Sequence, residues 1–420
     1  MRLLTHALSQ FNKMFGDLRT LRKYPGFTRL ISARLISNFG NGFMPIALSF
    51  GILALPGGSA SDVSLVLGVQ LAPTIAFMIF GGVAGDRFKR NQIVGGSDVI
   101  GSLFVFLSAA SFIFGFTSIA LLCITGFIFG VLNAFWWPAF SGMLPEILPK
   151  EQLQKGNATV GLLTNFGYVA GSLVAGILVA SFGAGWAILI DGISFLIAGV
   201  LVWGIDLPSI STSDNEKPPA MWRELREGWS EFISRKWVVV VVIAFSFVNL
   251  AYEATLGVLG PIATKEHNGG PKQWSWVIAA ITLGMIVGGV LALRVHFSRP
   301  LLIGILPEIF VGVWIFMIGV PNQLVATLLV AFATGISLEI FYVAWSTSMQ
   351  QHIPSESYSR VISYDALGSY ALAPIGLVVI GPIIEAIGVV QTSRLLALMT
   401  AIAVLTPVTF KEVRSLRNVA

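Results

Sequence analysis

Long apolar runs constrain this chain more than any other feature. A helix needs about 20 mostly apolar residues to cross about 30 Å of hydrocarbon. Hydrophobic residues fill 55% of the 420 positions and charged residues only 11%, whereas soluble domains carry about 25% charged residues. We therefore predict an all-α membrane protein with twelve transmembrane helices. The expected spans cover residues 27–55, 62–85, 94–116, 118–142, 156–182, 184–205, 237–262, 274–296, 299–319, 322–349, 358–384 and 388–410.

Two short repeats indicate that the chain consists of two related halves. The second span ends in Gly-Gly-Val-Ala-Gly-Asp-Arg (81–87), and the eighth in Gly-Gly-Val-Leu-Ala-Leu-Arg (288–294), with Leu293 in the place of Asp86. Residues 148–155 and 353–360 share the pattern aliphatic-Pro-x-Glu-x-bulky-x-base. Duplicated bundles with a site between them are a common transporter plan, so we predict two pseudo-symmetric six-helix bundles. The expected domains are an N-terminal amphipathic segment (1–26), the first bundle (27–205), a linker with an interfacial helix (206–236), the second bundle (237–410) and a tail (411–420).

The basic residues predict the orientation in the membrane. Every lysine and arginine except Lys265, Lys272 and Arg394 falls on one side of the predicted spans or at the inner end of span 1. Because cytoplasmic loops are enriched in these residues, we expect both termini in the cytoplasm and the chain in the plasma or inner membrane. The net charge of +5 is then explained by attraction of these basic residues to anionic membrane lipids. No nucleic-acid partner is expected.

Several classes of protein are excluded by what the sequence lacks. The start of the chain has no cleavable signal peptide, and a single cysteine, Cys123, rules out a disulfide within the chain. The four histidines lie outside the apolar runs or at their edges, so no metal site is expected. Without a phosphate-binding loop or a nucleophile–base constellation, neither an enzyme nor a cofactor is expected. We expect a monomer.

Two stretches have the pattern of helices that lie on a membrane surface. Apolar residues at helical spacing alternate with bases near the N-terminus and again in the linker. The first stripe is Leu4, Leu8, Phe11, Phe15 and Leu18, and the second is Trp222, Leu225, Trp229 and Phe232.

The loop after span 2 resembles the signature G-x-L-A-D-R-x-G-R-K of the major facilitator superfamily. Gly82, Gly85, Asp86, Arg87 and Arg90 fit that signature. Other segments resemble the twelve-span drug:proton antiporter branch, which includes macrolide and siderophore exporters. They are residues 137–140, 144–146, 222–228, 350–354 and 360–365.

The resemblance implies a gate at the cytoplasmic end of span 2. In the family, the acid of this motif meets the N-terminus of span 11 in the outward-open state, and helix N-termini favour anions. Asp86 would then be a latch, and Gly82 and Gly85 would let two helices approach closely. Two departures stand out: Tyr168 replaces the branch's usual proline in span 5, and residues 125–130 lack an arginine. The branch's usual proton relay is therefore not expected here.

Placing a charged carboxylate at the centre of a membrane span costs about 2.5–3.5 kcal/mol of insertion free energy. We therefore expect each carboxylate within a span to have a function or a structural partner. Spans 1, 4, 7 and 10 line the cavity in this superfamily, with contributions from spans 2, 5, 8 and 11. The candidates for proton coupling are therefore Glu253, Glu339 and Asp365. For Asp98, Asp191 and Glu308, in spans 3, 6 and 9, we expect structural pairing or packing, and for Arg34 a role in gating or pairing.

Polar and aromatic residues of the same spans predict a substrate cavity. A large apolar pocket with few polar groups suits a lipophilic, often cationic ligand. The cavity candidates are Asn38, Asn41, Asn133, Trp136, Asn165, Tyr168, Tyr252, Tyr342 and Trp345. The sequence therefore predicts a secondary transporter that exports a small lipophilic compound in exchange for protons by alternating access. A lipid or lysolipid translocator of the same fold and a transport-dead membrane sensor remain as alternatives.

Overall fold

The computed structural model describes residues 20–207, 221–267, 269–292 and 298–417, and every regular element there is a helix. The stripe at residues 4–18 and the repeat position Leu293 lie outside these ranges. The first half contains α2 (Pro25–Asn41), α3 (Met44–Leu53), α4 (Ala60–Arg87), α5 (Arg90–Phe114), α6 (Ile119–Ile147), η1 (Lys150–Gln152), α7 (Leu153–Phe182) and α8 (Ala184–Trp203).

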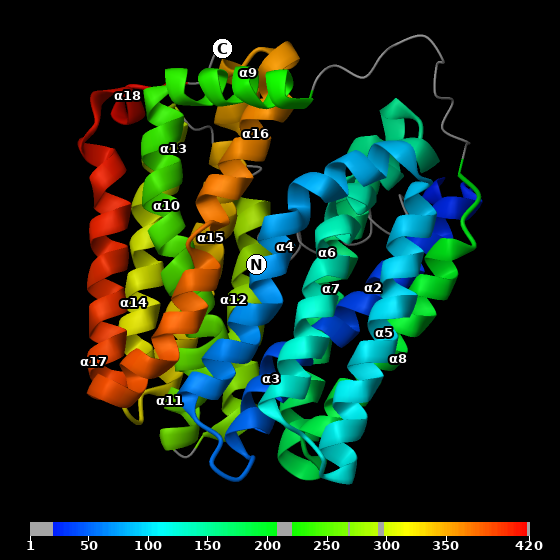
Figure 1. Cartoon of the computed structure of the whole chain (residues 1–420). Coiled ribbons are helices and arrows are strands. Elements are labelled where there is room, and N and C mark those ends of the chain that lie inside the picture. Colours follow the sequence, from blue (N-terminus) through cyan, green and yellow to red (C-terminus); the bar gives the residue numbers. More distant parts are fainter. Residues whose placement is uncertain (1–19, 208–220, 268, 293–297, 418–420) are drawn as a thin grey trace, which may run out of the picture.

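The second half begins with a helix across one end of the molecule. It contains α9 (Met221–Ser234), α10 (Lys236–Ala254), η2 (Thr255–Leu259), α11 (Gly260–Glu266), α12 (Gly270–Ala292), α13 (Pro300–Ile305), η3 (Leu306–Glu308), α14 (Ile309–Ile318), α15 (Leu324–His352), α16 (Ser355–Tyr370), α17 (Ala373–Thr409) and α18 (Lys411–Arg414). We call the end with α9 and α18 the α9 face and the opposite end the far face (Figure 1).

The number of membrane spans agrees with the prediction. Eleven stretches of the described residues are long and apolar enough to cross a bilayer, and the last, Val361–Thr409, has 49 residues. That stretch contains a break at Gly388, with φ 79° and ψ 165°, a conformation that glycine adopts without steric cost. It is therefore two spans, which makes twelve.

Two spans are irregular within their length. Span 1 is interrupted between Asn41 and Met44, where a Cβ on Gly42 would lie 2.6 Å from the Ser172 nitrogen of α7. Span 7 contains a π-helical turn at Thr255–Leu259. Such turns occur mostly at functional sites, and irregular backbone at this depth is tolerated where protein or a cavity surrounds it.

Close glycine contacts pack equivalent helices in the two halves. In the first half, a Cβ on Gly81 of α4 would lie 2.0 Å from the Ala134 carbonyl oxygen of α6. In the second half, a Cβ on Gly288 of α12 would lie 2.8 Å from the Ile336 carbonyl oxygen of α15. The Gly-Gly repeat thus lets the second and fourth spans of each half approach closely.

The two halves are joined at the far face. Four hydrogen bonds between described residues of the two halves lie there: Ser49 Oγ to Gly257 O (2.8 Å), Ser61 N to Glu385 Oε1 (2.9 Å), Gly381 N to Ser64 Oγ (2.7 Å) and Lys265 Nζ to Leu53 O (2.5 Å). We call these four bonds the seal. Towards the α9 face the two groups of helices diverge (Figure 1).

The linker helix α9 rests on the second half. Trp229 packs on Phe232 with ring centroids 5.7 Å apart and on Tyr364 of α16 at 5.5 Å. The expected apolar stripe therefore contacts protein through Trp229 and Phe232, although half of the Trp229 side chain remains exposed. The side chains of Trp222 and Leu225 lie outside the described ones.

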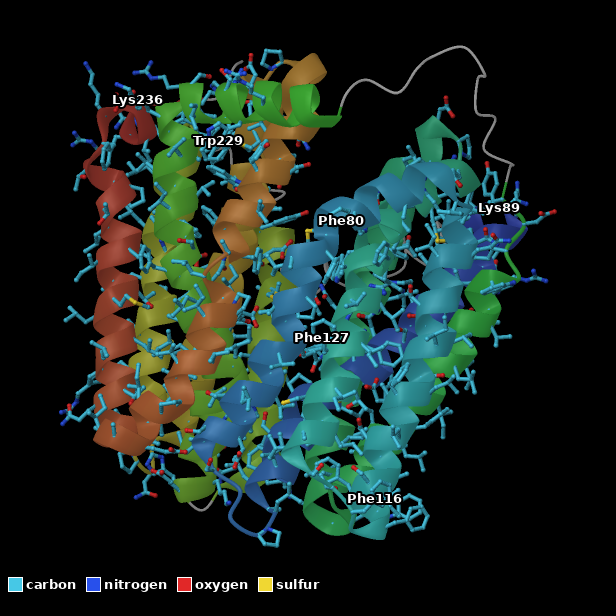
Figure 2. All side chains as sticks on the ribbon, viewed as in Figure 1. Phe80, Lys89, Phe116, Phe127, Trp229 and Lys236 are labelled. Carbon is cyan, nitrogen blue, oxygen red and sulfur yellow. The ribbon has the colours of Figure 1, made fainter. Side chains whose placement is uncertain are left out.

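Side chains around the outside fit a bilayer. Large apolar side chains such as Phe116 (50% exposed) and Phe127 (47%) point outwards. Lys89 and Lys236 lie near the α9 face and Phe116 near the far face (Figure 2).

Candidate functional site

A carboxylate held by neutral donors lies on α16 of the second half. The Trp345 indole N–H of α15 donates to Asp365 Oδ2 at 2.9 Å, and Ser369 Oγ donates to Asp365 Oδ1 at 3.2 Å. Asn249 Nδ2 of α10 donates to the Ser369 carbonyl at 2.9 Å. Asp365 thus links spans 10 and 11, and the Ser369 carbonyl links span 11 to span 7. The acid can carry a negative charge or a proton.

Aromatic rings extend from Trp345 along α10 and α15. Phe341 stacks on Phe245 with centroids 3.9 Å apart and on Trp345 at 6.1 Å. Trp237 meets Trp345 edge to face at 5.5 Å and His352 at 6.2 Å. Phe245 and Trp345 are buried, so the column packs the interior of the second half beside Asp365.

A second acid lies where the halves meet. Glu253 of α10 is close enough to Tyr168 of α7 and to Tyr370 of α16 for electrostatic interaction. Tyr252 packs against Trp314 of α14 with centroids 5.7 Å apart. Glu253 directly precedes the end of α10 and the π-helical turn, so a regular and an irregular helix segment meet beside it.

Glu339 occupies a different place from the other two predicted acids. It packs on α12, where its Oε1 lies 3.6 Å from the position that a Cβ on Gly289 would take. Tyr342, one turn further along α15, is 65% exposed. The three predicted proton carriers therefore do not form one cluster.

The predicted cavity residues of the first half differ in burial and lie on three different helices, α2, α6 and α7. Asn38 is buried and donates to the Arg34 carbonyl at 2.9 Å, and Asn41 ends α2. Trp136 is 7% exposed and stacks on Phe140 with centroids 4.7 Å apart, so it belongs to the interior of this half. Asn133 of α6 and Asn165 of α7 are partly buried.

The gating motif ends α4 at the α9 face. The backbone of Gly82, Gly85, Asp86 and Arg87 is helical, and their side-chain surroundings lie outside what the structure describes. Arg90 binds within its own half: its Nη1 lies 2.6 Å from Glu146 Oε1 and donates to the Gly142 carbonyl at 3.0 Å. This arginine thus ties the start of span 3 to the end of span 4.

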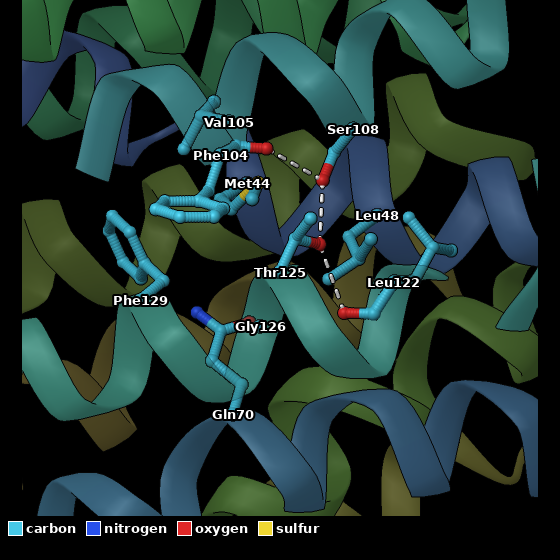
Figure 3. A pocket seen from close by; sticks show the side chains of 10 residues that line it. All are labelled: Met44, Leu48, Gln70, Phe104, Val105, Ser108, Leu122, Thr125, Gly126 and Phe129. Carbon is cyan, nitrogen blue, oxygen red and sulfur yellow. Dashed lines mark hydrogen bonds between the residues drawn. The ribbon is translucent and has the colours of Figure 1, made fainter. Parts of the chain in front are cut away.

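Two hollows among the described residues lie elsewhere. The first has a volume of about 20 Å³, enough for about one water molecule, and lies between α3, α4, α5 and α6 of the first half. Ser108 and Thr125 hydrogen-bond across it at 2.8 Å (Figure 3). The second, of about 180 Å³, lies at the far face of the second half beside His267 and Asn322. None of the predicted cavity residues lines either hollow.

Sequence reasoning missed two members of the Asp365 network. Asn249 and Ser369 are small polar residues whose spacing gives a signal: Ser369 follows Asp365 by four positions and Asn249 precedes Glu253 by four. Residues at this spacing share one helix face. Among the described residues, no group of three or more His, Cys, Asp or Glu side chains could hold a metal ion.

Twelve spans in two similar halves, with Glu253 where the halves meet and one end sealed, are typical of a membrane transporter. The family model of the Major Facilitator Superfamily matches residues 30–377. The chain belongs to this superfamily and is a multi-pass membrane transporter of that type.

The relatives are distant and cover most of the chain. The chain is 25% identical over 357 residues to an uncharacterized MFS-type transporter, YkuC, of Bacillus subtilis, with 81% of each chain covered. It is 24% identical over 385 residues to the multidrug efflux pump Tap of Mycolicibacterium fortuitum (88% and 91% covered). It is also 24% identical over 404 residues to macrolide efflux protein A of Streptococcus pyogenes (93% and 97% covered).

Solved structures show the same fold. The nucleoside transporter NupG superposes with a TM-score of 0.73 at 10% identity, covering 91% of this chain and 98% of that one. A bacterial homologue of the human lysosomal transporter Spinster, in an inward-facing and unoccupied conformation, gives 0.69 at 15% identity, covering 94% and 98%. Identities this low support the fold alone.

Proposed function

We propose that this chain exports a hydrophobic, drug-like compound or natural product in exchange for protons. The observation that carries the proposal is the asymmetry of the two ends: hydrogen bonds seal the far face, whereas the two groups of helices diverge towards the α9 face (Figure 1). The efflux function named for the macrolide and multidrug relatives supports the direction of transport.

We place the α9 face in the cytoplasm. Lys89 and Lys236 lie near that face (Figure 2), whereas Lys265 takes part in the seal at the other. Because lysine and arginine favour the cytoplasmic side, we place both termini there. We propose that the arrangement with a sealed far face is the inward-open state of a monomer in the plasma or inner membrane.

The transport cycle uses rocking of the two halves around the acids. In the inward-open state, a ligand entering from the cytoplasm displaces a proton from Asp365 or Glu253, with Glu339 as a third candidate. Opening the far face then releases the ligand and admits a proton. One proton supplies about 2.3 kcal/mol per 100 mV and about 1.4 kcal/mol per pH unit, enough to drive export.

Substrate-induced proton release tests this function. In weakly buffered detergent solution, we expect the purified protein to release protons when a macrolide antibiotic or a lipophilic cation is added. One of the variants Asp365→Asn, Glu253→Gln and Glu339→Gln should abolish the release, because the amide cannot titrate, and that variant identifies the acid. Glu412→Gln, which removes an exposed acid from α18, should release protons as the unchanged protein does.

The other outcomes distinguish the alternatives. Ligand binding without proton release in the unchanged protein would overturn proton exchange. Lipid movement in reconstituted vesicles without drug transport would identify a lipid or lysolipid translocator. The absence of both activities would favour a sensor.

A further inference from the structure

A charged cluster lies inside the first half, away from the Asp365 network. Arg34 of α2 is 8% exposed, Asp98 of α5 is 6% exposed and Asp191 of α8 is fully buried. Arg34 and Asp98 follow the α9-face ends of their helices by nine and eight residues, which at 1.5 Å per residue places them at a similar depth.

The three groups lie within electrostatic range of one another in turn, from Arg34 to Asp98 and from Asp98 to Asp191. The Arg34 guanidinium lies 4.8 Å from the ring centroid of Trp136 and 4.4 Å from that of Phe140. It is therefore held against span 4 by cation–π contacts.

The Asp191 carboxylate is buried without a hydrogen-bond donor in the described part of the chain. Its Oδ1 faces Gly40 of α2, 2.6 Å from where a Cβ would be, and Ser194 donates instead to the Asp191 main-chain carbonyl at 2.8 Å. Of the two roles expected for Asp191, pairing or packing, the described residues show the packing, against Gly40 of α2, without a hydrogen bond to the carboxylate.

No other charge of the neighbouring helices offsets this group. Arg29 donates to the Gly204 carbonyl, Arg90 pairs with Glu146, and Lys155 lies at the start of α7. Tyr168 of α7 faces Glu253 of the other half. Of the two buried acids, Asp98 has the cation Arg34 beside it, and the charged neighbour of Asp191 is Asp98. An ionised carboxylate without a donor is strongly disfavoured in such surroundings.

We infer that Asp98 and Asp191 form a proton-binding site in the first half and that Arg34 responds to its occupancy. One proton on Asp191 leaves Arg34 and Asp98 as a neutral pair. A second proton, on Asp98, removes the counter-ion of Arg34. Because span 1 continues from Arg34 into α3, which carries Ser49 of the seal, occupancy of this site biases the state of the seal.

The inference deepens the proposed function by locating a proton outside the Asp365 network. Infrared spectroscopy tests it directly, because the carboxyl C=O stretch appears only when the acid is protonated. We expect pH-difference spectra of the purified protein to contain a buried-carboxyl band that moves when aspartate is labelled with ¹³C in its carboxyl group. The band should persist in Asp365→Asn and in Glu308→Gln, which removes a buried acid of the other half, and should change in Asp98→Asn and Asp191→Asn.

The ¹³C-aspartate-labelled protein without substitutions gives a result even if Asp98→Asn or Asp191→Asn does not fold. A label-sensitive band that persists in Asp365→Asn supports the site, and the absence of any such band overturns it. An unchanged band in folded Asp98→Asn and Asp191→Asn also overturns it. In vesicles, Asp191→Asn should keep ligand exchange at equal pH and lose pH-driven accumulation, whereas a purely structural role would impair both. The two proposals can fail separately. If the unchanged protein releases protons on ligand binding but the infrared test fails, proton exchange is supported and the Asp98–Asp191 site is refuted.

Discussion

Gly381→Val is expected to shift the transporter from the inward-open towards the outward-open state. Gly381 of α17 packs on α4, where an added Cβ would lie 2.4 Å from the Ala60 carbonyl oxygen and 2.6 Å from Ser64 Oγ. The Gly381 N–H also donates to Ser64 Oγ in the seal. Overpacking of this kind costs about 1–3 kcal/mol, which corresponds to about a 5- to 150-fold change in the ratio of the two states.

A single reporter cysteine can measure this shift. Cys123 is the chain's one cysteine, so Cys123→Ser gives a protein without thiols. Ser275→Cys then places a single thiol in the closed contact between α12 and Gly176 of α7. We expect a membrane-impermeant maleimide added outside to label it faster when Gly381→Val is present. Gly161→Val, at a site with no atom within 4 Å of an added Cβ, is the matched control, and equal labelling of the two variants would refute the expectation.

Asp86→Asn is expected to abolish transport while membrane insertion and ligand binding persist. Asp86 lies on the last turn of α4, and α16 begins at Ser355 on the same α9 face. An acid at a helix N-terminus gains about 0.3–2 kcal/mol, and the amide loses this charge interaction. The seal joins α4 to α17 at the far face, so this latch would form only as the seal opens.

The two variants should therefore act in opposite directions. Asp86→Asn removes a contact of the outward-open state, and Gly381→Val weakens one of the inward-open state. Combining them should return the labelling of Ser275→Cys towards the level of the parent, with ligand binding measured in parallel. Labelling in the double variant equal to that of Gly381→Val alone would show that Asp86 does not hold the outward-open state.

The positions of the spans were predictable from sequence because the bilayer requires each span to be apolar and about 20 residues long. The predicted span 94–116 corresponds to α5 at Arg90–Phe114, and the boundary near residue 388 corresponds to the break at Gly388. The interruption of span 1 and the π-helical turn of span 7 were not predictable. They depend on local packing, such as Gly42 against the Ser172 backbone, which no periodicity of apolar residues encodes.

The site was predictable only at the level of residue type. An acid and an indole in cavity-lining spans stand out in sequence, and Asp365 and Trp345 lie within hydrogen-bond distance. Which acids have partners depends on helix rotation and side-chain conformation. Asp191 and Glu308 were expected to be paired or packed, and among the described residues neither has a hydrogen-bond partner. Glu339 was grouped with Asp365 and instead packs on α12.

The π-helical turn gives this transporter a simple evolutionary route to a different conformational balance. A π turn closes with a hydrogen bond between residues i and i+5, one residue more than an α-helical turn, so deleting one residue there can restore a regular α-helix. The carbonyl of Gly257, inside this turn, accepts the hydrogen bond of Ser49. A one-residue deletion in Thr255–Leu259 would therefore change how firmly the far face closes without replacing any residue of the Asp365 network, so that transport rate and ligand preference can diverge independently among descendants of this chain.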